Sequence, residues 1–82
     1  MEKMYHTITI TIYDRAAVFT KVGELLHQYA DNISLRVGYP VPEKNTSVIF
    51  LIVTLTNDEL GALSGKLGQI NSVKVKSTSL KF

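Results

Sequence analysis

An aspartate and an arginine stand side by side where a strand-like segment gives way to a helix-like one. Asp14 and Arg15 follow the alternating stretch 5–13 and precede apolar residues at helical spacing. The first turn of a helix has free backbone amides and the positive end of the helix dipole, so this junction can hold a small anion. The alternative is that the Asp14 carboxylate caps the helix and Arg15 is an ordinary surface residue.

Two histidines are the other side chains with ligand chemistry. His6 shares a strand face with Ile8, and His27 lies opposite the apolar side of the following helix. Imidazole suits nickel, iron and zinc, so His6, His27 and Asp14 could form a metal site across subunits. The alternative is one structural histidine and one solvated histidine. The chain has no cysteine, which excludes disulfides, thiolate metal sites and cysteine-ligated iron–sulfur clusters. The sequence names no cofactor.

Three lysines near the end of the chain, Lys74, Lys76 and Lys81, form the remaining charged group. Lys74 and Lys76 alternate with valines, which predicts a solvated sheet edge. The net charge is only +2, and no helix-turn-helix or aromatic platform accompanies the lysines, so direct nucleic-acid binding is not predicted. No nucleophile–base pair, metal-ligand cluster or P-loop is present, so we expect no enzyme.

The hydrophobic periodicity predicts the elements that position these residues. Period-two alternation marks a strand over 5–13, and apolar residues at helical spacing mark a helix that ends near Ala30. Asn57 is the expected cap of a second helix, and Gly68 is its expected end. The other strands are expected over 33–39, 47–55 and 73–80, with a turn at 40–45.

The order βαββαβ predicts an α+β ferredoxin-like sandwich, a four-stranded antiparallel sheet with two helices on one face. Its 82 residues suffice for one domain, 1–82, that is small and thin on core. The start of the chain has no apolar signal segment, and the longest apolar run, 48–53, is too short to span a membrane. We therefore expect a cytoplasmic protein.

The strand expected over 47–55 does not alternate, although a sheet covered on one side should do so. Large apolar residues run without a break from Val48 to Val53, so the uncovered face carries Val48, Phe50 and Ile52 or their neighbours. Leaving such a face in water favours aggregation. We therefore predict that a second copy covers it in a homodimer or homotetramer.

Glycines interrupt the second expected helix. Gly61, Gly65 and Gly68 fall beside its apolar stripe, although an interior helix glycine costs about 1 kcal/mol relative to alanine. Contact with another chain or a ligand at Gly61 and Gly65 would compensate for this cost. The alternative is tight packing of the helix on its own sheet.

Several stretches resemble known families. Residues 13–18, Leu25-Leu26, Asn32-Ile33 and the ending 67–75 resemble ACT domains, which are amino-acid-sensing regulatory modules of βαββαβ fold that pair side by side or face to face. The stretches 35–41 and 61–70 are similar to small regulators associated with iron-only hydrogenase systems. That family is similar in fold to the C-terminal domain of the nickel-responsive repressor.

The resemblance implies a regulatory domain, with a role in transcription or the hydrogenase system, that senses a small molecule or metal at a subunit interface. We expect the ligand near Asp14, Arg15, Asn32, Arg36 and Tyr39. Ala16 and Ala17 replace the glycine that ACT domains commonly have at this junction, and two histidines without cysteine do not reproduce the repressor's nickel site. The alternative function is a ligand-free scaffold that binds a protein partner.

Overall fold

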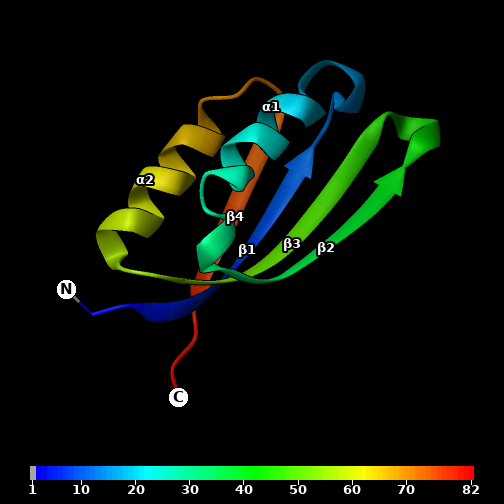
Figure 1. Ribbon diagram of the computed structural model, residues 1–82. Helices are drawn as coiled ribbons and strands as arrows, with labels where there is room; N and C mark the ends of the chain where they lie inside the picture. The colour runs from blue at the N-terminus through cyan, green and yellow to red at the C-terminus, as the bar shows by residue number, and fades with distance from the viewer. Residues whose placement is uncertain (1) are drawn as a thin grey trace.

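Strands and helices alternate along the chain in the order βαββαβ (Figure 1). The computed structural model describes residues 2–82. Two short 3₁₀ helices span Ala30–Asn32 and Pro42–Lys44. The main elements are β1 (Met4–Ile12), α1 (Arg15–His27), β2 (Ile33–Val41), β3 (Thr46–Leu55), α2 (Asn57–Gly68) and β4 (Val73–Ser79).

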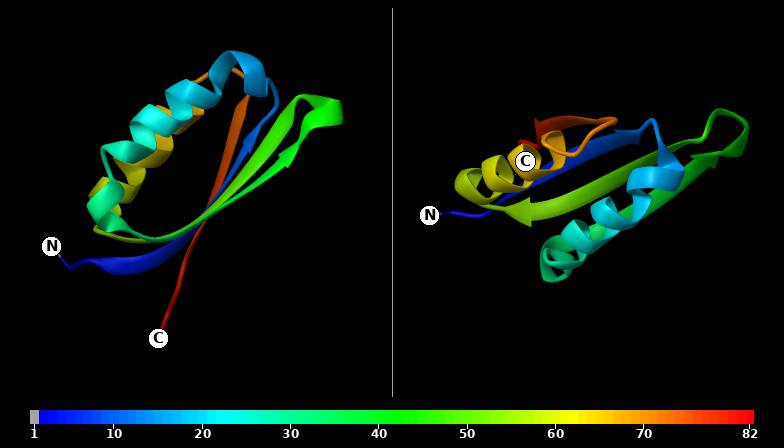
Figure 2. Two further views of the ribbon diagram at one scale, coloured as in Figure 1. Left: turned by 45° about the vertical axis from the view of Figure 1, so that its right-hand side comes forward. Right: turned by 90° about the horizontal axis from the view of Figure 1, so that it is seen from above.

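The four strands form one antiparallel sheet in the order β2-β3-β1-β4. Both helices lie against the same face of the sheet, and the opposite face is bare (Figure 2). The β2–β3 hairpin extends beyond the helices at one end (Figure 1). This arrangement confirms the predicted α+β ferredoxin-like sandwich.

Buried and partly exposed side chains alternate strictly along β1, and the buried ones form one side of the core. Its even-numbered residues from His6 to Ile12 are buried under the helices, while Thr7, Thr9 and Thr11 face the bare side. Each helix contributes residues three or four positions apart, as an amphipathic helix should. The other buried apolar residues are Val18, Val22, Leu26, Ile49, Leu51, Val53, Leu55, Leu63 and Leu67.

A β-bulge in β2 decides which of its side chains face the bare side. Ile33 pairs with the buried Val53, whereas Leu35 pairs with Ile52 after a register shift. The extra residue reverses the alternation, because side chains have a period of two along a strand. Leu35, Val37 and Tyr39 therefore share the bare face with Phe50.

The second helix begins one residue earlier than predicted. Thr56, not Asn57, is the N-cap: its hydroxyl accepts from the amide of Glu59, and the Glu59 carboxylate accepts from the amide of Thr56. This reciprocal pair is a capping box, and the bond from the Thr56 amide is the main cause that lowers the pKa of Glu59. Gln69 rather than Gly68 is the C-cap. Among residues 2–82, neither helix is long and apolar enough to cross a membrane.

Candidate functional site

The β1–α1 junction is closed by the tip of the β2–β3 hairpin. Asn45 accepts from the amide of Arg15 through its backbone oxygen, at 2.8 Å, and from the amide of Ala16 through Oδ1, at 3.1 Å. Its Nδ2 donates to Oδ1 of Asp14 at 2.9 Å. A left-handed backbone at Asn45, with φ of 50°, aims these groups at the helix.

Because of these contacts, α1 has no free amide in its first turn. The amides of Ala17 and Val18 both donate to the backbone oxygen of Asp14, each at 3.1 Å. Asp14 is the N-cap residue, but its side chain makes no capping bond. The predicted capping by the Asp14 carboxylate and the predicted free amides are therefore both wrong, since Asn45 occupies the helix start.

A pocket of about 540 Å³ lies beside this junction, between the start of α1 and the α2–β4 connection. The Asp14 carboxylate and the Lys21 ammonium give its rim both signs of charge. Of the residues predicted to bind a ligand, only Asp14 lines it. The complete lining is Asp14, Ala17, Val18, Lys21, Gln69, Ile70, Asn71 and Ser72.

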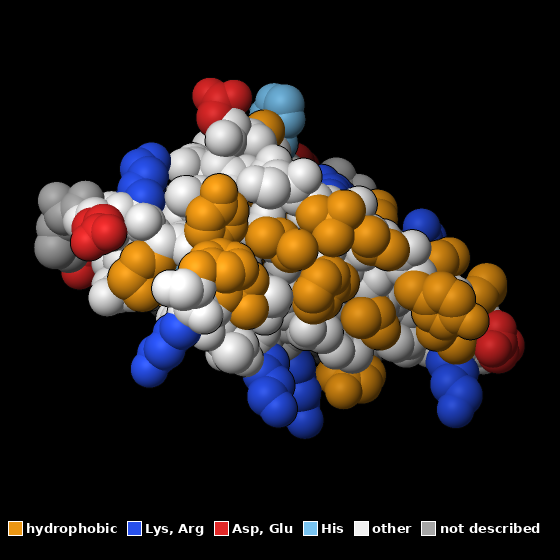
Figure 3. All heavy atoms as spheres, turned by 90° about the horizontal axis from the view of Figure 1, so that it is seen from below, with side chains coloured by type: hydrophobic (Ala, Val, Ile, Leu, Met, Phe, Trp, Pro, Cys, Tyr) orange, Lys and Arg blue, Asp and Glu red, His pale blue; other side chains and the backbone are white. Residues whose placement is uncertain are grey.

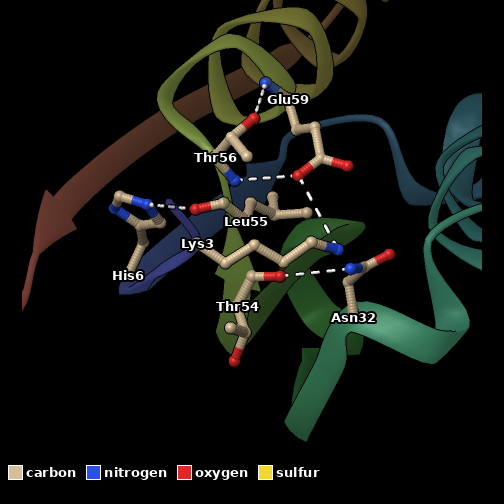
Figure 4. Close-up of polar contacts among 7 residues, drawn as sticks. All are labelled: Lys3, His6, Asn32, Thr54, Leu55, Thr56 and Glu59. Atoms are coloured by element: carbon tan, nitrogen blue, oxygen red, sulfur yellow. Dashed lines mark hydrogen bonds and ion pairs between the residues drawn. The ribbon is translucent and has the colours of Figure 1, made fainter. Parts of the chain in front are cut away.

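None of the other predicted ligand residues lines this pocket. The Arg15 guanidinium stacks on the ring of Phe19, with 4.4 Å between the guanidinium carbon and the ring centroid. Asn32 follows the C-terminal end of α1, about 20 Å from its start for a helix of 13 residues. There Nδ2 of Asn32 donates to the backbone oxygen of Thr54 at 3.1 Å (Figure 4).

Arg36 and Tyr39 lie on opposite faces of β2. Arg36 pairs with the buried Leu51 and is on the helix side of the sheet, whereas Tyr39 pairs with Val48 on the bare side. Both side chains are exposed because β2 is an edge strand. Within one protomer the described residues therefore form no single ligand site from the predicted set, and a shared site stays a prediction for two protomers.

The two histidines also lie apart. His6 is fully buried, and its Nδ1 is paired with Oγ of Ser79 at 3.0 Å. Its Nε2 donates to the backbone oxygen of Leu55 at 3.1 Å (Figure 4). His27 is exposed at the end of α1. Residues 2–82 contain no group of three or more histidine and acidic side chains that could hold a metal ion. A metal site from these residues would need a second protomer and a rearranged His6.

The bare face of the sheet carries the apolar residues predicted for an interface. Val48, Phe50 and Ile52 point to this side from β3, and β2 adds three neighbours that sequence analysis did not place there. Figure 3 shows the hydrophobic side chains gathered over this face. We call this surface, made of Leu35, Val37, Tyr39, Val48, Phe50 and Ile52, the apolar patch.

The glycines of α2 face open space on the side where a side chain would begin. A Cβ atom added at Gly61, Gly65 or Gly68 would meet nothing within 4 Å, and all three residues are exposed. The alternative of tight packing on the sheet is therefore wrong. The glycine side of α2 is open, and an interface at Gly61 and Gly65 stays a prediction.

Comparison with solved structures supports the fold. The chain is similar to uncharacterized protein TM1266 from Thermotoga maritima, with 51% identity over 98% of this chain and 100% of that one, and a TM-score of 0.93. It is also similar to the ACT domain of GTP pyrophosphokinase from Chlorobium tepidum, with 19% identity over 93% and 99% of the two chains and a TM-score of 0.77.

A more distant likeness covers a formyltetrahydrofolate deformylase from Pseudomonas syringae pv. tomato, with 14% identity over 96% of this chain and 28% of that one, and a TM-score of 0.66. The likenesses below 25% identity show the ACT-like fold alone. A search of curated proteins finds no match to this chain.

The family is shown by a model that matches residues 4–77 and is described as "TM1266-like: Iron-only hydrogenase system regulator, putative". That match spans nearly the whole chain and agrees with the resemblance in the stretches 35–41 and 61–70. The chain therefore belongs to the TM1266-like family.

Proposed function

We propose that the protein is a non-enzymatic regulatory domain that works as a homo-oligomer and responds to a small effector bound between protomers. The family description and the ACT-like fold support the regulatory role. In this proposal a second copy covers the bare face of the sheet. The effector favours one assembly over another and thereby changes contact with a protein partner. For this it needs only to bind the two assemblies with different affinity.

The apolar patch is the observation that carries the proposal. Its exposed fractions reach 69% at Tyr39, 49% at Val37 and 36% at Phe50, although these residues lie together on one face. A contiguous apolar surface of this kind marks an interaction site in soluble proteins. Self-association is the simplest way to cover it, because each copy brings the same apolar surface.

The size of the patch indicates an adjustable assembly. Completing the burial of six partly exposed apolar side chains contributes about 1 kcal/mol each, or about 6 kcal/mol per copy and about 12 kcal/mol for a pair. Association costs about 4–15 kcal/mol in lost translational and rotational freedom. The two terms are of similar size, so an effector with modest differential affinity can shift the equilibrium.

The effector site is proposed at a junction between protomers. Asp14 borders the pocket at the start of α1, while Arg36 and Tyr39 stand exposed on the edge strand β2. A second copy beside or against β2 could bring such groups together with the partner's Arg15 or Asn32. This arrangement keeps the predicted ligand residues but distributes them over two chains.

A thermal-shift screen followed by sedimentation velocity tests the proposal. The purified protein is screened against amino acids, nucleotides, and divalent nickel, iron and zinc, and each hit is then sedimented with and without the compound. An effector at about 100 times its Kd adds about 2.7 kcal/mol to folding stability. The proposal predicts a hit that also changes the sedimentation coefficient; hits that leave the assembly unchanged would contradict it.

A ligand-free scaffold for protein–protein contact is the second candidate. The closure of the α1 start by Asn45 favours it, because the amides that could hold an effector anion are already bonded within the chain. Pull-down of the same partner by the protein, unaffected by any compound in the screen, would support the scaffold over the sensor.

A further inference from the structure

The bare face of the sheet has an apolar half, formed by β2 and β3, and a polar half, formed by β1 and β4. Cross-strand pairing places Val37, Phe50, Thr9 and Lys76 in one row, in that order from β2 to β4. The two flanking rows repeat the order of two apolar residues followed by two polar ones. They are Tyr39, Val48, Thr11 and Lys74, and Leu35, Ile52, Thr7 and Thr78.

The polar half is hollowed. A depression of about 390 Å³ is lined by Thr9, Thr11, Lys74, Val75 and Lys76. Each lysine lies directly across from a threonine, Lys74 from Thr11 and Lys76 from Thr9. Neighbouring strands are about 4.8 Å apart, so a lysine ammonium and a threonine hydroxyl can contact the same functional group of a bound ligand.

The donors in this depression are unused within the described part of the chain. Neither threonine hydroxyl takes part in a side-chain hydrogen bond, and neither lysine pairs with a carboxylate. The Lys74 ammonium lies over the ring of Tyr13, with 5.9 Å between Nζ and the ring centroid. No acidic residue occurs in β1 or β4. The depression therefore combines two positive charges with hydroxyl donors and no competing anion.

This chemistry matches a phosphate group better than a carboxylate. A phosphate monoester carries close to two negative charges at neutral pH and offers three acceptor oxygens, whereas a carboxylate has one charge and two oxygens. Lys74 and Lys76 point to the same side of β4, about 7 Å apart along the strand. A single phosphate or a diphosphate can therefore contact both ammonium groups and a threonine hydroxyl.

We propose that Thr9, Thr11, Lys74 and Lys76 form a binding site for a phosphate-bearing small molecule on the bare face of the sheet. The inference goes beyond the proposed function, because this site is distinct from the junction proposed above for the effector. It rests on the proposed function only in that a bound phosphate would act on the contact between copies. The site borders the apolar patch at Phe50 and Val48, the patch residues paired with Thr9 and Thr11. A bound phosphate would thus lie at the edge of the proposed contact between copies. There it would neutralise Lys74 and Lys76, which otherwise repel the same lysines of a second copy.

The test is calorimetric titration of the full chain with pyrophosphate and with ADP at constant ionic strength. The variant K74Q/K76Q removes the charges, and K44Q/K66Q is the matched control that removes two lysine charges elsewhere. The site predicts equal affinity for wild type and control and at least about tenfold weaker binding by K74Q/K76Q. A tenfold change corresponds to about 1.4 kcal/mol, which is no more than the loss of one charged hydrogen bond. The isosteric variant T9V/T11V keeps the charges and should bind several-fold more weakly.

Equal binding by all variants would overturn the proposal, since binding would then not depend on these lysines and threonines. Equal weakening in both double lysine variants would overturn it as well, since each lowers the net charge from +2 to 0 and the loss would indicate nonspecific attraction to a positive protein. Absence of pyrophosphate and ADP binding by the wild type would overturn it too. Sedimentation of the same samples separates this failure from that of the proposed function. A monomer that binds pyrophosphate through Lys74 and Lys76 keeps the site and removes the assembly, whereas an oligomer that binds neither compound keeps the assembly and removes the site.

Discussion

Replacing Asn45 should loosen the contact between the β2–β3 hairpin and α1. The Asn45 side chain accepts from the amide of Ala16 at 3.1 Å and donates to Asp14 at 2.9 Å, so it caps the helix from a distant part of the chain. Loss of a helix cap costs about 1 kcal/mol. Asn45→Gly removes the cap but tolerates the left-handed backbone, and should therefore destabilise the fold by about 1 kcal/mol.

Asn45→Ala removes the same cap. It also places a residue that has a Cβ atom, but no polar side chain to form local hydrogen bonds, in the left-handed conformation at φ of 50°. That conformation costs about 1–2 kcal/mol more for such a residue. The expected order of stability is wild type, then Asn45→Gly, then Asn45→Ala, with total losses of about 1 and about 2–3 kcal/mol.

Urea unfolding followed by circular dichroism measures both losses, at one protein concentration because self-association would also contribute to stability. For a domain of this size, a loss of 1 kcal/mol moves the midpoint by about 1 M urea. A wild-type midpoint in Asn45→Gly would refute the capping role of the side chain. Equal midpoints in the glycine and alanine variants would refute the cost assigned to the backbone.

Two other perturbations test α2. The pKa of Glu59 is lowered chiefly by the bond from the Thr56 amide, so its contribution to stability is present above the unfolded pKa of about 4.3 and is lost as the pH falls toward the lower folded value. Unfolding of wild type and Glu59→Gln between about pH 6 and pH 3 should show their stability difference shrinking toward acid; a constant difference would contradict the capping box as its source. Gly61→Ala and Gly65→Ala should each add about 0.5–1 kcal/mol in thermal unfolding, because an added Cβ meets nothing within 4 Å. A loss of stability or of assembly would instead place another chain against this side of α2.

The fold could be predicted from sequence because its main signals are local. The alternating isoleucines and threonines of β1 and the helical spacing of the leucines in α2 each fix an element and its buried face. The unbroken apolar run of β3 also indicated correctly that one set of its side chains stays uncovered. The capping box Thr56-x-x-Glu59 is a local signal too, and it places the helix start one residue before the position that Asn57 alone predicts.

The candidate site was harder to predict because it depends on contacts between distant residues. Asn45 is 29 residues from Ala16 along the chain, and nothing local shows that a turn asparagine caps a remote helix. The bulge between Ile33 and Leu35 sets which face Arg36 and Tyr39 occupy, and one extra residue exchanges those faces. Alternation within 35–39 could have revealed the apolar side of β2, but not the direction in which it points.

Sedimentation equilibrium of wild type and Val37→Lys tests most directly the proposal that a second copy covers the apolar patch. Val37 is 49% exposed, so the change places a charge in the patch with little effect on the core, and Phe82→Lys is the control because Phe82 is 98% exposed and outside the patch. We predict a concentration-dependent oligomer for wild type and control, and association at least about 30-fold weaker for Val37→Lys, since each of two copies loses about 1 kcal/mol. A wild-type monomer at all concentrations, or equal association of all three proteins, would contradict the account.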